Sequence, residues 1–270
     1  KDKVSIPYVT HLTHSVTPLF TQEDAISAML SDLTNAKTLM ANDPIRLGTT
    51  PASCLASLPS GEFLADDKIP TWHNRRFRFN YYAAVATMAR VFLWKGDREN
   101  ALLCAQEVIR DQETKFPWVL KENLIHVGDV NTANNFRNQD RAFATEHIFA
   151  LNATKLETLS DGYLYGGQGS LLLTDRSIYP SSFDYRYKNL FKILDGTTLY
   201  VTRKYESLSN VSAAFKNRIP MIRISEMYYI AAECLLATGK DADRLLAIER
   251  LNTVREKRGM FGLGNDLTVA

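Results

Sequence analysis

The stretch SEMYYIAAECLLATGKDADRLLAIERLNTVR, at Ser225–Arg255, decides the fold, because its pattern also occurs at Asn80–Arg110, NYYAAVATMARVFLWKGDRENALLCAQEVIR. In both stretches a small residue stands seven positions before a glycine, and apolar residues recur at helical spacing after it. The aligned pairs are Ala89 and Ala232, Phe92 and Leu235, Gly96 and Gly239, Ala105 and Ile248, and Val108 and Leu251.

This pattern predicts two helical hairpins. The small residue allows two helices to approach closely, the glycine forms the turn, and the later apolar positions build a shared seam. Ala101 supplies a second small residue in the first copy, whereas Arg244 occupies that position in the second, which is therefore degenerate. The predicted fold class is mainly α, with tetratricopeptide-like hairpins forming a scaffold and a long loop-rich insertion that contains short strands.

The chain divides into helical parts around this insertion. Residues 21–42 and 80–111 form the first helical part, and residues 221–259 form the second hairpin. Thr21, followed by two acidic residues, is placed to cap the helix over 21–42. The region 112–220 is rich in Gly, Asn, Asp, Ser and Tyr, with candidate strands at 146–151 and 197–205. We predict that it is the ligand region, because long loops on a rigid scaffold commonly carry function.

Composition excludes several function classes. The 32 basic and 30 acidic residues nearly balance, which argues against a nucleic-acid-binding surface. No apolar run approaches the roughly 20 residues of a membrane helix. The pair His11 and His14 lacks a nearby acidic or cysteine partner, and no nucleophile or paired-carboxylate motif occurs. We therefore expect no metal, no cofactor and no enzymatic activity.

Aromatic residues outside the predicted helices offer a binding chemistry without a catalytic pair. An indole or phenol ring can lie against the apolar face of a sugar while polar side chains bind its hydroxyls. The alternative is that these rings fix long loops to the helical core. They include Trp118 and Tyr187, and the predicted ligand-binding residues are Trp72, Tyr163, Tyr165, Tyr179 and Tyr185.

The order of these segments resembles the SusD/RagB family of surface-exposed outer-membrane lipoproteins of Bacteroidetes. Residues 21–39 are similar to a family helix, here with Met29, Asp32, Leu33 and Ala36, and residues 80–109 are similar to its first hairpin. Glu146–Leu151 and Asp184–Arg186 resemble two shorter segments. The most specific match covers residues 218–259 and carries Pro220, Ile222, Arg223, Glu226, Ala232, Glu233, Gly239, Leu251, Asn252, Arg255, Arg258 and Gly259.

This resemblance implies a non-catalytic cell-surface protein that binds a glycan and delivers it to a SusC-like TonB-dependent transporter. Membrane association would occur only through a lipid anchor that is not present in this chain. We expect residues 1–270 to form a single SusD-like domain, incomplete at both ends, and the chain to be an internal or trimmed part of a longer protein. The alternatives are a helical-repeat adaptor for protein partners, or a SusD-like binder of peptides.

Overall fold

The computed structural model describes residues 5–12, 14–48, 75–124, 140–160, 162, 177–179, 181–194, 196–206, 217–260, 262 and 266–268. The longer helices are α1 (Gln22–Leu39), α5 (Tyr81–Lys95), α6 (Arg98–Arg110), α10 (Ile224–Leu236) and α11 (Asp241–Glu256). The shorter helices are α2 (Pro44–Leu47), α7 (Gln112–Lys115), α8 (Leu156–Ser160) and α9 (Tyr185–Asn189), with 3-10 turns η1 (Lys121–Asn123) and η4 (Ala144–Glu146). The strands are β1 (Ser5–Pro7), β2 (Leu19–Thr21), β3 (His147–Asn152), β4 (Phe191–Ile193), β5 (Tyr200–Thr202) and β6 (Arg218–Arg223).

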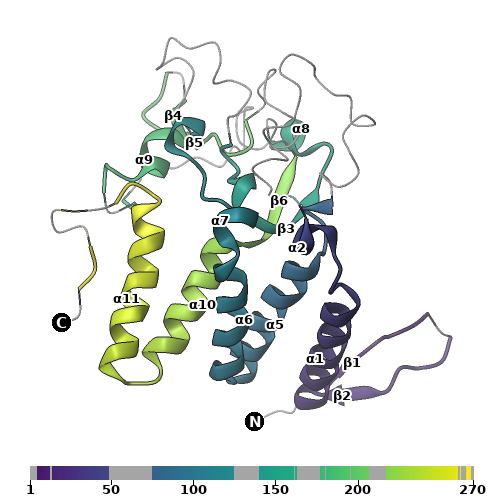
Figure 1. Ribbon diagram of the computed structural model, residues 1–270. Coiled ribbons are helices and arrows are strands. Elements are labelled where there is room, and N and C mark those ends of the chain that lie inside the picture. The colour runs from purple at the N-terminus through teal and green to yellow at the C-terminus, as the bar shows by residue number, and fades with distance from the viewer. Residues whose placement is uncertain are drawn as a thin grey trace.

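The five longer helices stand side by side in the order α1, α5, α6, α10, α11 (Figure 1). The strand pairs β3–β6 and β4–β5 lie beyond the upper ends of these helices in Figure 1. The predicted mainly α fold class is confirmed, and no helix among the described residues is both long and apolar enough to cross a membrane.

The first helix begins where the sequence predicted. The Thr21 hydroxyl accepts the Asp24 N–H at 3.2 Å, and α1 runs to Leu39. Ahead of it, β1 and β2 pair antiparallel, a short hairpin that the apolar pattern of residues 5–21 had not indicated. An ion pair of 2.6 Å between Lys37 and Glu107 then ties α1 to α6.

The first predicted hairpin is α5–α6. Asn80 caps α5 by accepting the Ala83 N–H at 3.0 Å, and Asp97 caps α6 by accepting the Asn100 N–H at 3.2 Å. Gly96 makes the turn with φ of 87°, a backbone region that favours glycine. Ala89 and Ala101 are completely buried, so the small residues allow close approach as predicted.

The second predicted hairpin is α10–α11, and its turn glycine, Gly239, has φ of 70°. Ala232 is buried as expected. Leu251 packs on the cluster of Ala232, Leu235 and Ala247, as the predicted seam requires. At the other predicted position the seam differs, because Ala247 is buried while Ile248 is only half-buried. The reason is that α11 packs mainly on α10, so a narrow stripe of small side chains suffices.

The region 112–220 holds more regular structure than its composition suggested. β3 pairs antiparallel with β6, aligning Leu151 with Ile219, and β4 pairs with β5. Both predicted strand segments are therefore present in the described residues. Because β6 leads directly into α10, the β3–β6 pair fixes the middle region to the second hairpin.

The main apolar core lies among α5, α6, α10 and the β3–β6 pair. Ile148, Ile222 and Met227 are at most 2% exposed. Complete burial of one such side chain contributes roughly 1.5–3 kcal/mol. Phe116, just after α7, packs edge-on against Tyr82 with ring centroids 5.4 Å apart, which anchors the start of the 112–220 region to the core.

Candidate functional site

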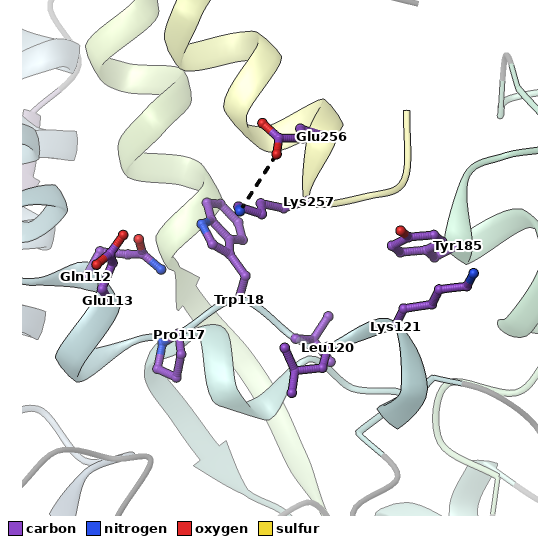
Figure 2. A pocket seen from close by; sticks show the side chains of 10 residues that line it. Gln112, Glu113, Pro117, Trp118, Leu120, Lys121, Tyr185, Glu256 and Lys257 are labelled. Carbon is purple, nitrogen blue, oxygen red and sulfur yellow. Dashed lines mark ion pairs between the residues drawn. The ribbon is translucent and has the colours of Figure 1, made fainter. Parts of the chain in front are cut away.

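A cleft of about 450 Å³ opens beside the C-terminal end of α11. Its walls come from α7 and the residues after it, from the start of α9, and from the end of α11, three segments that are distant in sequence (Figure 2). This size lies in the range of small-molecule sites. The lining residues are Gln112, Glu113, Pro117, Trp118, Val119, Leu120, Lys121, Tyr185, Glu256 and Lys257.

Trp118 forms one aromatic wall of the cleft. Its side chain is half-buried and rises from the chain between Gln112 and Leu120 (Figure 2). Behind it, the Tyr228 ring centroid lies 5.3 Å away, and the Arg258 guanidinium lies 5.2 Å from the indole centroid. The indole is therefore held by neighbours while it still lines the cleft.

Tyr185 forms the second aromatic wall. It is the first residue of α9, and its N–H donates to the Arg258 carbonyl at 2.8 Å. Its ring lies directly on Gly259, where a Cβ atom would stand 2.4 Å from Tyr185 Cε1. Gly259 also has φ of 85°. Both its conformation and this contact therefore require glycine.

Buried charges stand behind both walls. Arg258 and Glu146 form two hydrogen bonds, Nη1 to Oε1 at 2.7 Å and Nη2 to Oε2 at 2.5 Å. Glu146 Oε1 also accepts the Val119 N–H at 3.1 Å. The Arg258 guanidinium lies 4.7 Å from the centroid of the Phe143 ring. Such a bidentate pair satisfies both charges away from water.

The turn that carries Glu146 is itself rigidly held. Asp140 accepts the N–H groups of Ala144 at 2.6 Å and Thr145 at 2.9 Å. Arg76 donates to the carbonyl of Thr145 at 2.6 Å. Burial raises the pKa of Asp140 to about 6, although these two N–H donors act against the rise.

The cleft itself carries balanced charge. Its lining includes two carboxylates, Glu113 and Glu256, and two ammonium groups, Lys121 and Lys257. Lys257 Nζ lies 4.0 Å from Glu256 Oε1, and Lys121 Nζ lies 5.5 Å from the Tyr185 ring centroid. Figure 2 shows Lys121 and Tyr185 alongside one another. Charged and amide groups thus surround two aromatic walls.

The sequence-predicted binding residues do not all gather at this cleft. Tyr185 lines it. Tyr179 does not: its ring packs against Phe191 at 5.6 Å between centroids, with the Arg186 guanidinium 5.1 Å from it. Burial raises the pKa of Tyr179. Trp72, Tyr163 and Tyr165 lie outside the described residues, so their role stays a prediction.

Sequence reasoning did not select Trp118, Lys121 or Gln112. Trp118 was one of several loop aromatics with no local pattern to distinguish it. One signal in the sequence could have pointed to the cleft. Gly259, the glycine after the last helix, marks a helix end and also a position where another side chain, here Tyr185, approaches the backbone closely. Glu226, one of the residues of the 218–259 match, forms an ion pair with Arg90. Among the described residues, no group of His, Cys, Asp and Glu is arranged to hold a metal.

Comparison with known proteins shows a family match over part of the chain and a shared fold over nearly all of it. Residues 188–265 match the family model described as the SusD family. A putative sugar-binding protein from Bacteroides vulgatus has the same fold, with 24% identity and a TM-score of 0.57, over 97% of this chain and 52% of its own. No curated protein matches the sequence.

Two further solved structures share the fold. A SusD superfamily protein from Bacteroides thetaiotaomicron has 20% identity and a TM-score of 0.59, over 94% of this chain and 51% of its own. Surface glycan-binding protein A from Bacteroides uniformis has 17% identity and a TM-score of 0.58, over 98% of this chain and 56% of its own. The chain therefore has the fold of these proteins, resembles the SusD family over residues 188–265, and spans about half the length of these structures.

Proposed function

We propose that this chain is the glycan-binding part of a cell-surface nutrient-capture protein, and that an oligosaccharide binds in the cleft between Trp118 and Tyr185. The observation that carries the proposal is the convergence of two aromatic walls with amide, carboxylate and ammonium groups in one cleft of about 450 Å³. Relatives of the same fold include proteins described as sugar-binding, as surface glycan-binding and as laminarin-binding, which supports a carbohydrate ligand.

The chemistry of the cleft suits capture. A sugar ring has an apolar face of C–H groups that packs on an indole, while its hydroxyls need donors and acceptors at the rim. Glu113, Lys121 and Lys257 supply these groups. The SusD family consists of binding proteins, and we assign no catalytic step to this chain.

We further propose that the bound glycan passes to a SusC-like TonB-dependent transporter. The protein would act at the outer surface of the outer membrane, held there by a lipid anchor in its full-length form. The similarity of residues 188–265 to the SusD family supports both statements. Co-purification of a TonB-dependent transporter with the full-length protein would test the partnership.

The test of the binding role is a screen of the purified chain against polysaccharides by affinity electrophoresis, followed by calorimetry on the retained glycan. Trp118→Ala should weaken binding at least tenfold, or about 1.4 kcal/mol. Trp94→Ala is the matched control, because Trp94 is 65% exposed on α5 and does not line the cleft. Equal affinity of Trp118→Ala and the parent chain would exclude the cleft as the site.

The two loop tyrosines Tyr163 and Tyr165 need a test of their own. The double alanine variant should also bind more weakly if these rings extend the site. Unchanged binding would remove them from the assignment and leave the cleft unaffected.

A protein-interaction role is the rival function, and exposed apolar residues on the scaffold favour it. Trp94, Tyr229 and Leu245 are between 48% and 65% exposed on α5, α10 and α11. In an adaptor, alanine substitutions there would weaken partner binding, and Trp118→Ala would have no effect. If the ligand is a peptide, the parent chain should bind no glycan in the screen. Trp118→Ala should then weaken binding of the peptide.

A further inference from the structure

We infer that the buried Glu146–Arg258 ion pair is the positioning element that sets the two aromatic walls of the cleft relative to one another. This inference rests on the proposed function, since the placement of Trp118 and Tyr185 matters only to a ligand bound between them. Neither Glu146 nor Arg258 lines the cleft. They would therefore act through the residues that do.

The pair is completely enclosed. The Glu146 side chain is 0% exposed and the Arg258 side chain 4% exposed, and the two residues lie 112 positions apart. Glu146 ends η4 at the entry to β3, while Arg258 follows the last turn of α11. The pair thus joins the middle region to the second hairpin directly behind the cleft.

The Trp118 wall is fixed by both partners. Glu146 accepts the N–H of Val119, the neighbour of Trp118, at 3.1 Å, which holds the backbone. Arg258 lies 5.2 Å from the indole centroid, which holds the ring. The planar guanidinium, fixed at both nitrogens by Glu146, suits this stacked position.

The Tyr185 wall is fixed by the backbone of the same arginine. The Arg258 carbonyl accepts the Tyr185 N–H at 2.8 Å, and the next residue, Gly259, supports the ring. A displacement of Arg258 would therefore move both walls at once. In contrast, a displacement of either wall alone would leave the other in place.

Energetics distinguish a positioning role from a purely stabilising one. Replacing a buried ion pair by well-packed apolar residues is often neutral for stability, whereas removing one partner leaves an unpaired buried charge. An apolar double replacement should therefore fold, yet it has neither the stacked guanidinium nor an acceptor for the Val119 N–H. Its defect should appear in the cleft and in glycan affinity.

The experiment compares the double variant Glu146→Leu/Arg258→Met with the parent chain in three measurements: melting temperature, calorimetric affinity for the glycan that the parent retains, and ¹⁹F NMR after labelling with 5-fluorotryptophan. Trp118→Phe assigns the Trp118 resonance. We expect a cooperative melt within a few degrees of the parent, a shifted or broadened Trp118 resonance, and at least tenfold weaker glycan binding. The matched control, Arg90→Met/Glu226→Leu, removes the ion pair between α5 and α10 and should leave the resonance and the affinity unchanged.

Two results would overturn the inference: glycan affinity within twofold of the parent in the Glu146→Leu/Arg258→Met variant, or a Trp118 resonance identical to the parent's. Failure of the proposed function looks different, because the parent chain would then bind no glycan. The Trp118 resonance of the double variant would still decide whether the ion pair positions the wall.

Discussion

The two helical hairpins share a turn but differ in what surrounds them. Gly96 and Gly239 both adopt positive φ, 87° and 70°, at the same place in the pattern. The partner helices then diverge. α6 buries Ala101, Cys104, Ala105 and Val108, whereas α11 buries only Ala247 and Val254.

The difference follows from position in the row of helices. α6 lies between α5 and α10 and must match both, while α11 is the outer helix and packs mainly on α10 (Figure 1). Ala101 is therefore fully buried, and its counterpart Arg244 is exposed. The arginine that made the second copy degenerate in sequence is tolerated because its side chain is exposed.

The ends of the two hairpins also differ. α6 leads through Asp111 into α7, whereas α11 ends at Glu256 and is followed by Arg258 and Gly259, which support the cleft. Both hairpins therefore lead into the candidate site, the first through α7 and Trp118, and the second through Arg258 and Gly259.

Exchanging the two equivalent residues should give the largest effect. Ala101→Arg places a charge at a fully buried position and should lower the free energy of unfolding by roughly 3–5 kcal/mol, or prevent folding. Arg244→Ala should change it by less than about 0.5 kcal/mol. Urea unfolding checks both, and a tolerated Ala101→Arg would show that the inner seam is not close-packed.

Acidification should lower the stability of the β3–β6 strand pair, in which His147 on β3 lies opposite Arg223 on β6. The pKa of His147 is lowered to about 3, mainly by burial. The hydrogen bond from Nε2–H to the Ala142 carbonyl raises this pKa, and nearby cations lower it further. The unfolded chain therefore takes up the proton first. The contribution of His147 is fully present above its ordinary value of 6.5, and about 3 kcal/mol of it is lost by pH 4.

The measurement is the unfolding free energy of the parent chain relative to His147→Gln at pH 7 and pH 4. The difference should move by about 3 kcal/mol in favour of the variant on acidification. Asp140 should have the opposite pH dependence, because its pKa is raised to about 6 and the folded chain takes up this proton first. The free energy of unfolding should therefore gain from Asp140 as the pH falls, and Asp140→Asn should remove this gain. A pH-independent difference for His147→Gln would contradict the assignment.

The two glycines on the second hairpin should separate backbone strain from site geometry. Gly239→Ala and Gly259→Ala each force alanine into positive φ, so each should cost about 1–2 kcal/mol in backbone strain, and the overlap with Tyr185 adds to the cost of Gly259→Ala. Only Gly259→Ala meets the Tyr185 ring, so only it should weaken glycan binding. In the part of the chain that the structure describes, no atom outside the neighbouring residues lies within 4 Å of a Cβ built at Gly239. Loss of affinity in both variants would point to general destabilisation instead.

Helix caps should give the smallest effects. Asp97→Ala removes the side-chain cap of α6 and should cost about 1 kcal/mol. Lys240 stands at the equivalent position of α11, where no side-chain cap bond forms, so Lys240→Asp should add up to about 1 kcal/mol. Thermal melts of the two variants should shift in opposite directions, and a destabilised Lys240→Asp would show that Lys240 has another role.

Much of the scaffold could be predicted because its signals are local. Thr21 caps α1 as its position in the sequence indicated, and Gly96 and Gly239 form the predicted turns. The burial of Ala247 in place of Ile248 could not be predicted, since it depends on α11 being the outer helix. The strand pair β1–β2 was missed because three-residue strands show no steady alternation.

The candidate site was predicted only in part. Tyr185 was selected as one of five aromatic residues and lines the cleft, whereas Tyr179, selected on the same ground, packs on Phe191. Chemically similar tyrosines six residues apart therefore have different surroundings. Composition identified the kind of residue that could bind a sugar, and could not say which ring meets the cleft.

By itself, the sequence determined the two hairpins, their turns and their caps, because each depends on residues within a few positions of one another. Only the tertiary structure decided the cleft. Trp118, Tyr185 and Lys257 come from three distant segments, and the pair that holds the walls joins Glu146 to Arg258 across 112 positions. Contacts of this kind arise from how the elements pack, and no local pattern in the chain specifies them.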